Sequence, residues 1–205
     1  MRKVGIEIYN FDELSKDIQE KLIEKRQDDD YNFYCDFELE KDMEDIAKNL
    51  LNEYFKGAIF KQVFYDLSCG QGSGSMIEFT ISLEDINKKY KALTKKEINK
   101  VSNLGYTQIN VYHNDNLYCH ENSYGIEYQD YTVYDNNLEK TQEKIDNMLE
   151  NFKKDIYDMN CELTKQGYIL LDEVSTRETA IYSLREYEYF KDGTIFNNDF
   201  TRENE

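Results

Sequence analysis

The fold is decided by residues 58–83, which read AIFKQVFYDLSCGQGSGSMIEFTISL. Two runs rich in β-branched and aromatic residues, Ala58–Leu67 and Met76–Leu83, lie on either side of the glycine- and serine-rich segment Ser68–Ser75. Apolar runs that are separated by turn-forming residues are typical of two strands joined by a loop. The stretch therefore predicts an antiparallel hairpin near the middle of the chain.

Further strands are predicted on both sides of this hairpin. Apolar residues alternate with polar ones in Lys3–Tyr9, Gly105–His113 and parts of Leu117–Tyr134, as they do in half-buried strands. Near the C-terminus, Tyr187–Phe196 places aromatic residues around Asp192-Gly193, which predicts a terminal hairpin. The expected result is an antiparallel sheet of about five or more strands.

Helices are predicted where apolar residues recur three or four positions apart, because this spacing places them on one helix face. The longest and clearest pattern is the late one. The predicted helices span residues 11–27, 32–55 and 138–167, and the lysine-rich residues 84–100 are expected to be helical or irregular.

The boundaries of these elements follow from local signals. Asp28-Asp29-Asp30 is expected to separate the first two helices, and Ser175 with Glu178 forms a capping-box pattern that opens a last one. No repeat or linker divides the chain, so residues 1–205 are interpreted as a single domain with residues 197–205 disordered. The fold class is α+β, an antiparallel sheet packed by several helices.

The overall charge restricts the classes of function. The sequence contains 25 Lys and Arg against 42 Asp and Glu, a formal net charge of −17. Direct nucleic-acid binding is not expected, because phosphate contacts need basic patches. No apolar run is long enough for a transmembrane helix, and the N-terminus lacks the apolar core of a secretory signal. The four cysteines form no CxxC pair, so we expect free thiols in a cytoplasmic protein.

The acidic residues are concentrated in two segments. Nine acids and one base lie between Asp28 and Asp45, and six acids, seven tyrosines and no Lys or Arg lie between Val101 and Glu139. The segments are either a solvated surface or a partner surface that imitates the charge and stacking of a nucleic acid. The candidate contact residues of the second alternative are Asp28, Asp29, Asp30, Asp36, Glu38, Glu40, Asp42, Tyr112, Tyr118, Glu121, Tyr124, Glu127, Tyr128, Asp130 and Tyr131.

The glycine-rich loop invites comparison with phosphate-binding loops. A dinucleotide-binding fingerprint would need a glycine where Ser75 stands and a helix after it, whereas a strand is predicted there. A nucleophile elbow centred on Ser73 would need glycines in place of Gln71 and Ser75. The loop is therefore interpreted as a flexible or bulged connection.

The two histidines, His113 and His120, flank a predicted hairpin turn beside Cys119. A turn with an even number of residues would pair His113 with Tyr118 and place both histidines on one face. An odd number would pair it with Leu117 and place the histidines on opposite faces. No third ligand of a suitable type lies nearby in sequence, so we expect hairpin histidines, with no metal and no cofactor.

Three motifs resemble an uncharacterised family of phages, prophages and Gram-positive genomes, some members of which are labelled antitoxin of a toxin–antitoxin stability system. Residues 11–15 (FDELS) match its opening, residues 65–74 (YDLSCGQGSG) are similar to its YSLSYxQGDG loop, and residues 111–120 (VYHNDNLYCH) resemble its VxHxGxYxH hairpin. The resemblance implies a mobile-element origin and residence in the host cytoplasm. It marks the loop residues Ser68, Gly70, Gln71, Gly72, Ser73 and Gly74 and the hairpin residues His113 and His120, with Ser73 in place of the family's acid.

The resemblance and the clustered acidity together lead to an expected function. We expect an acidic phage protein of the anti-CRISPR type, which inhibits a host nucleic-acid-binding defence effector by entering its basic channel as a nucleic-acid mimic. The expected partner is an RNA-guided nuclease, with no direct nucleic acid, no membrane and no enzymatic activity. Two alternatives stay open: an antitoxin of a basic toxin, and a small enzyme that uses the glycine-rich loop and the two histidines.

Overall fold

The computed structural model describes residues 6–68, 70, 72–105, 107–114, 119–131, 138–174 and 176–196. Contacts within the chain divide it into two compact units. The terminal unit comprises residues 1–39 and 169–205, and the central unit comprises residues 40–168. Helix α5 (Glu139–Val174) contributes residues to both units, and the interpretation as a single domain stays a prediction. The predicted disorder of residues 197–205 lies outside the described residues.

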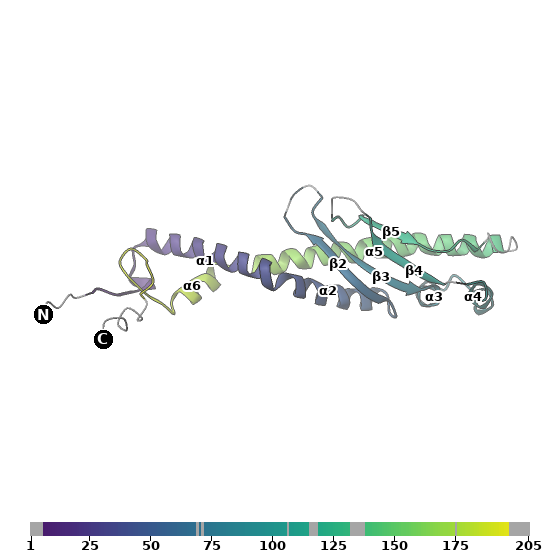
Figure 1. Ribbon diagram of the computed structural model, residues 1–205, viewed down its shortest axis with the longest axis horizontal. Helices are drawn as coiled ribbons and strands as arrows, with labels where there is room; N and C mark the ends of the chain where they lie inside the picture. Colours follow the sequence, from purple (N-terminus) through teal and green to yellow (C-terminus); the bar gives the residue numbers. More distant parts are fainter. Residues whose placement is uncertain are drawn as a thin grey trace, which may run out of the picture. The chain divides into compact units, whose positions relative to one another are not determined.

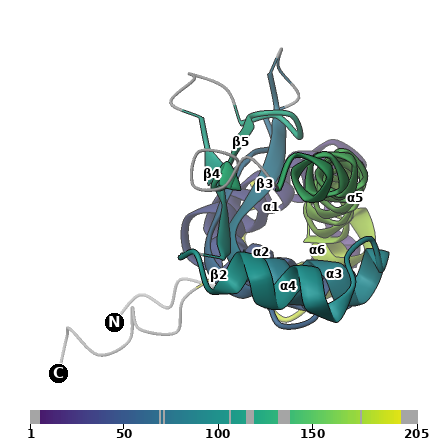
Figure 2. The same ribbon diagram turned by 90° about the vertical axis from the view of Figure 1, so that its right-hand side faces the viewer.

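The central unit is built on a four-stranded antiparallel sheet in the order β2-β3-β4-β5. Helix α5 runs along one face of this sheet (Figures 1 and 2). The strands are β2 (Ile59–Asp66), β3 (Gly74–Ser82), β4 (Gln108–His113) and β5 (Tyr124–Glu127). The helices besides α5 are α2 (Leu39–Tyr54), α3 (Leu83–Tyr90) and α4 (Lys95–Ser102).

The hairpin predicted from residues 58–83 is confirmed and carries the core of the central unit. β2 pairs antiparallel with β3, and Phe64 lies opposite Met76. The Phe79 ring of β3 stacks on Phe55, just after α2, with 5.6 Å between centroids. Phe152 of α5 meets both rings edge-on, at 4.8 and 6.1 Å, and is completely buried. Three interlocked rings therefore hold the sheet to two helices.

Three polar contacts tie the short helices α3 and α4 to α5. Lys89 of α3 pairs with Asp155 (Nζ–Oδ2, 2.6 Å), and the Tyr90 hydroxyl donates to the same carboxylate at 2.7 Å. The Lys89 ammonium also lies within 5.6 Å of the centroids of three aromatic rings. Glu97 of α4 pairs with Lys144 at 2.7 Å. These contacts hold α3 and α4 against the long helix.

The substitution Glu97→Gln is expected to lower the free energy of unfolding by about 1 kcal/mol at neutral pH. Hydrogen bonds from Lys144 and Thr94 lower the pKa of Glu97 from 4.5 to about 2. A carboxylate with a lowered pKa stabilises the fold above its unfolded-state pKa, and this contribution is lost as the pH falls through the folded-state value. Glutamine preserves the capping box with Thr94 and removes the charge. The difference in urea unfolding between the two proteins therefore measures what the ion pair with Lys144 contributes to stability. A stability difference that persists unchanged at pH values near 2 would contradict this prediction.

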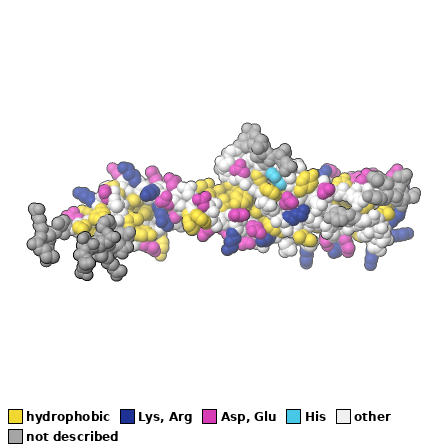
Figure 3. Space-filling model, in the orientation of Figure 1, with side chains coloured by type: hydrophobic (Ala, Val, Ile, Leu, Met, Phe, Trp, Pro, Cys, Tyr) yellow, Lys and Arg dark blue, Asp and Glu magenta, His cyan; other side chains and the backbone are white. Residues whose placement is uncertain are grey.

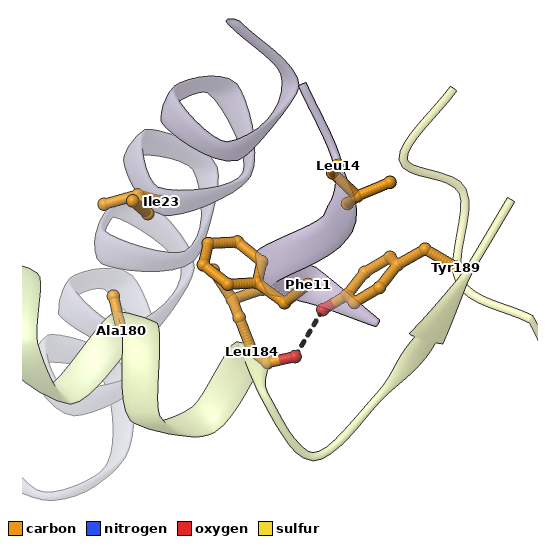
Figure 4. Close-up of a cluster of buried hydrophobic side chains, with 6 residues drawn as sticks. All are labelled: Phe11, Leu14, Ile23, Ala180, Leu184 and Tyr189. Carbon is orange, nitrogen blue, oxygen red and sulfur yellow. Dashed lines mark hydrogen bonds between the residues drawn. The ribbon is translucent and has the colours of Figure 1, made fainter. Parts of the chain in front are cut away.

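The terminal unit joins segments from the two ends of the chain. One end supplies β1 (Tyr9–Asn10), the 3-10 helix η1 (Phe11–Glu13) and α1 (Lys16–Phe37), and the other supplies α6 (Arg177–Leu184) and β6 (Glu188–Tyr189). β1 pairs antiparallel with β6. The buried apolar cluster in Figure 4 consists of Phe11, Leu14, Ile23, Ala180, Leu184 and Tyr189.

Polar contacts reinforce the junction of the two ends. The Tyr189 hydroxyl donates to the Leu184 carbonyl at 2.7 Å inside the cluster (Figure 4). On the surface, Arg177 forms a bidentate pair with Glu20, with N–O distances of 2.7 and 2.6 Å. Arg185 forms a similar pair with Asp12. The two ends of the chain are therefore held together by packing and by paired charges.

The predicted helix break at Asp28-Asp29-Asp30 is wrong, because α1 runs through these residues to Phe37. Aspartate in a helix interior costs less than about 1 kcal/mol per residue. Asp30 also pairs with Arg26, one turn earlier, at 3.0 Å. Buried Ile23 and Tyr34 anchor the helix on both sides of the three aspartates. Packing therefore outweighs the local preference for a break.

The predicted end of the late helix at Gly167 is also wrong, because α5 continues to Val174. Gly167 serves close packing instead. A Cβ atom at this position would lie 2.9 Å from Leu67 Cδ1 and 3.0 Å from Met43 Sδ. The glycine therefore allows α5 to approach the end of β2 and the start of α2.

The other predicted elements differ from the observed ones mainly in their lengths and boundaries. Within the described residues, the predicted strands Lys3–Tyr9 and Leu117–Tyr134 are reduced to β1 and β5; residues 3–5, 117–118 and 132–134 lie outside the described ranges. The segment predicted as helical or irregular contains α3 and α4. In the terminal hairpin, the Phe190 N–H donates to the Thr194 carbonyl at 2.8 Å around the predicted turn. The last helix is capped by Thr176, and Ser175 lies outside the described residues.

Candidate functional site

The glycine-rich loop is a hydrogen-bonded turn between β2 and β3. The Ser73 Oγ accepts from the Gly70 N–H at 2.8 Å and lies 3.2 Å from the Ser68 Oγ. Gly72 has a φ of +93°, which glycine adopts without strain. The predicted strand after the loop is confirmed, where a dinucleotide-binding fingerprint would need a helix. Gln71 lies outside the described residues.

The loop and both histidines meet at one end of the central sheet. A Cβ atom on Gly74 would lie 3.0 Å from the Cys119 carbonyl oxygen and 3.1 Å from the His120 Cα. The His113 ring stacks on Phe64 of β2, with 4.5 Å between centroids. The fold therefore brings together the second and third motifs of the sequence, which are about 40 residues apart.

The predicted pairing of the histidine hairpin is wrong. His113 pairs with Tyr124 of β5, not with Leu117 or Tyr118. The connection between β4 and β5 therefore spans residues 114–123 and contains His120. Tyr118 lies outside the described residues. The longer connection, and not a tight turn, carries His120 to the glycine-rich loop.

A buried asparagine fixes this connection to the sheet. Asn160 of α5 is completely buried; its Oδ1 accepts from the Ile77 N–H and its Nδ2 donates to the Glu121 carbonyl, each at 3.2 Å. One turn later, the hydroxyls of Thr164 and Ser75 share a hydrogen bond of 2.8 Å. Sequence reasoning missed these residues. The available signal was a pair of polar residues four positions apart inside the apolar pattern of the long helix.

The substitution Asn160→Ala is expected to lower the free energy of unfolding by about 2–3 kcal/mol. It leaves the Ile77 N–H and the Glu121 carbonyl without their buried partner, and unsatisfied buried groups are costly. Urea unfolding measures the loss. The matched control is Asn151→Ala, an exposed asparagine of the same helix, which is expected to change stability by less than about 0.5 kcal/mol. Equal effects of the two substitutions would contradict a bridging role for Asn160.

The thiols near this junction are poorly suited to nucleophilic catalysis. Burial raises the pKa of Cys119 to about 12 and also raises the pKa of Cys161, so both thiols stay protonated. The His120 Nδ1 lies 3.2 Å from a carboxylate oxygen of Glu121. Among the described residues, no group of three His, Cys, Asp or Glu side chains could hold a metal ion. The hydrogen bonds of Asn160 and Thr164 give the junction a structural role.

The predicted acidic residues fall on both units. On the terminal unit, Asp28, Asp29 and Asp36 of α1 and Glu38 after it are exposed, and none of them forms an ion pair within the described part of the chain. Asp30 is half-buried and pairs with Arg26. All Lys and Arg of α1 precede Asp28, and Figure 3 shows acidic and apolar side chains over its second half.

Two exposed phenylalanines accompany these acids. Phe33 and Phe37 are 57% and 72% exposed, and their ring centroids lie 5.1 Å apart. Asp29, Phe33 and Asp36 share one helix face because they are spaced by four and three residues. Exposed apolar rings surrounded by charge mark interaction surfaces. We define the α1 acidic surface as Asp28, Asp29, Phe33, Asp36, Phe37 and Glu38.

The sequence-based list of contacts did not include the two phenylalanines. The signal that could have found them is their spacing of one helical turn inside an acidic stretch. On the central unit, the predicted contact Glu40 is exposed and Asp42 is half-buried. The predicted acidic segment is thus divided between the two units, and only its first part carries exposed aromatic rings.

The predicted tyrosine contacts are mostly engaged within the central unit. Tyr131 is only 4% exposed, so its placement on a contact surface is wrong and it belongs to the core. Tyr124 donates to the Lys153 carbonyl at 2.9 Å, and Tyr128 donates to Asp146 at 3.2 Å. Tyr112 is 39% exposed. Of these tyrosines, Tyr112 and Tyr128 offer the largest accessible surface.

The acids predicted alongside these tyrosines are also distributed. Glu121 is half-buried in the junction, and Glu127 of β5 accepts from the Asn110 side chain at 3.3 Å. Asp130 is exposed. Asp130 lies near Tyr128, whose hydroxyl is engaged by Asp146. The α1 acidic surface carries the more exposed rings and is therefore the stronger candidate.

Comparison with models of protein families, with curated proteins and with solved structures finds no match. The resemblance drawn from the three motifs therefore stays a prediction. No helix in the described ranges combines the length and apolar character needed to cross a bilayer. The structure defines an α+β protein with a four-stranded antiparallel sheet and a two-stranded one.

Proposed function

We propose that this protein is an acidic inhibitor that binds the basic channel of a host nucleic-acid-binding defence effector. The expected partner class is an RNA-guided nuclease, whose channel holds a nucleic acid by its backbone. The observation that carries the proposal is the α1 acidic surface, where four exposed carboxylates that form no ion pair among the described residues lie beside two exposed aromatic rings. Carboxylates imitate phosphates, and the rings imitate stacked bases.

The net charge of −17 supports the same proposal. A strongly negative protein is attracted to a groove lined by Lys and Arg, and this attraction accelerates association. The exposed rings add apolar area that charge alone does not supply, and aromatic residues are frequent anchors of interfaces. The charge attracts the partner from a distance, and the rings supply apolar contact area once the two proteins have met.

Affinity capture from a host lysate, with elution along a salt gradient, tests the proposal. The expected result is a nucleic-acid-binding protein that moderate salt releases and that its own nucleic acid displaces, because both ligands compete for one basic channel. A captured protein that holds its nucleic acid and this chain together would overturn the mimicry. Capture of a basic toxin encoded beside the gene would favour the antitoxin alternative.

A further inference from the structure

One edge of the central sheet ends in a strand that another strand can extend. Among the described strands β2 pairs only with β3, so alternate backbone N–H and C=O groups of β2 face away from the sheet. The register with β3 is interrupted by a bulge between Phe60 and Gln62 and is regular from Gln62 to Asp66. A regular edge is the geometry to which an extended segment adds as a further strand.

A groove borders this edge. It has a volume of about 280 Å³ and lies between the beginning of α2 and β2. Glu40 and Glu44 line it from the helix, and the exposed Lys61 and the half-buried Val63 and Tyr65 line it from the strand. An added strand would therefore meet backbone groups along β2 and carboxylates beside it.

The charges of the groove favour a basic occupant. Glu44 pairs with Lys48 at 2.6 Å, and Lys61 pairs with Glu78 at 3.6 Å. Glu40 is exposed and forms no ion pair within the described ranges, so it is available to a cation. The net charge of −17 strengthens the attraction of a basic segment and opposes the docking of a second copy.

We propose that β2, from Gln62 to Asp66, binds an extended basic segment of a partner protein by strand addition. Backbone hydrogen bonds supply much of the affinity, and every second side chain of the segment reaches Glu40 and Glu44. The recognised segment therefore alternates basic residues with small or apolar ones. This inference rests on the proposed function, because it names how one part of a basic partner is held.

The experiment uses the full chain and a fluorescent peptide of alternating arginine and threonine. The matched peptide has the same charge but carries N-methyl groups on every second residue, so it cannot complete a ladder of hydrogen bonds. Fluorescence anisotropy is expected to show at least about tenfold weaker binding of the methylated peptide. Hydrogen exchange is expected to show that only the unmodified peptide protects amides within residues 62–66. The N-methyl groups lie on the peptide, so the fold of the protein is not at risk.

Matched variants test the role of the carboxylates. Glu40→Gln combined with Glu44→Gln is expected to weaken binding of the unmodified peptide about fivefold. Glu139→Gln combined with Glu143→Gln makes the same change of charge at exposed positions of α5 and is expected to leave binding almost unchanged. Equal effects of the two double variants would overturn the proposed groove.

Two further outcomes would overturn the proposal. Equal binding of the two peptides would show electrostatic adsorption without strand addition. Protection of β2 amides without peptide, rising with protein concentration, would identify a second copy as the occupant. Neutralising the α1 acidic surface is expected to leave the peptide-induced protection of β2 unchanged. Failure of the proposed function, which is read from capture of the effector, is therefore distinguishable from failure of strand addition.

Discussion

Binding to the proposed basic partner is expected to weaken about 30-fold when the four carboxylates of the α1 acidic surface become amides, because each exposed charge pair contributes about 0.5 kcal/mol. The substitutions are Asp28→Asn, Asp29→Asn, Asp36→Asn and Glu38→Gln. All four side chains are exposed, so the fold is expected to tolerate the changes. The dissociation constant, measured against salt concentration, is also expected to lose most of its salt dependence.

A control variant with the same change of net charge separates local contacts from overall attraction. Its substitutions are Glu139→Gln, Glu143→Gln, Asp172→Asn and Glu173→Gln, all at exposed positions of α5. This control is expected to slow association slightly and to leave dissociation unchanged. Equal losses of affinity in the two variants would show that net charge, and not the α1 acidic surface, governs binding.

The aromatic part of the same surface makes a separate contribution. Phe33→Ala combined with Phe37→Ala removes the exposed ring pair and leaves every carboxylate in place. If the rings act as apolar anchors, this double variant weakens binding without changing its salt dependence. The two contributions can therefore be separated by how affinity depends on salt concentration. Loss of the carboxylates reduces this dependence, whereas loss of the rings leaves it unchanged.

The substitution Phe152→Ala is expected to lower the free energy of unfolding by about 3–5 kcal/mol, the usual cost of removing a buried phenylalanine. The Phe152 ring contacts Phe55 and Phe79, so its removal leaves a cavity where α5, α2 and the sheet meet. Urea unfolding at a single wavelength and temperature measures the loss. Few single substitutions in this chain are expected to have a larger effect.

The substitution Phe37→Ala is the matched control for this measurement. Phe37 is 72% exposed, so its truncation is expected to change stability by less than about 0.5 kcal/mol. A loss at Phe152 as small as that at Phe37 would mean that the core is not organised around the three interlocked rings.

Local periodicity was sufficient to predict the parts of the fold that depend on neighbours in the sequence. The hairpin of β2 and β3 and the long helix α5 follow from alternation and from helical spacing. The continuation of α1 through Asp28-Asp29-Asp30 could not be predicted from local periodicity. The packing that holds this helix involves Ala180 and Leu184, about 150 residues away. Distant contacts of this kind leave no periodic signal.

The candidate site could likewise be predicted from the sequence only in part. The sequence located the acidic residues of α1, because clustering of charge is visible in one dimension. It did not show that Tyr131 is buried or that Asn160 bridges β3 and the segment after β4. Both facts depend on how strands and helices face one another. Composition can therefore suggest a binding surface, whereas its members are known only after folding.

The union of the chain's two ends in the terminal unit has a consequence for biosynthesis. Ile23 of α1 packs with Ala180 and Leu184, which the ribosome adds more than 150 residues later. At typical rates of about 5–20 residues per second, α1 waits roughly 7–30 seconds for these partners. During this interval its apolar side lacks the partners that cover it in the folded terminal unit. The central unit, residues 40–168, is complete before the terminal unit can form, so the nascent chain matures from its middle outward.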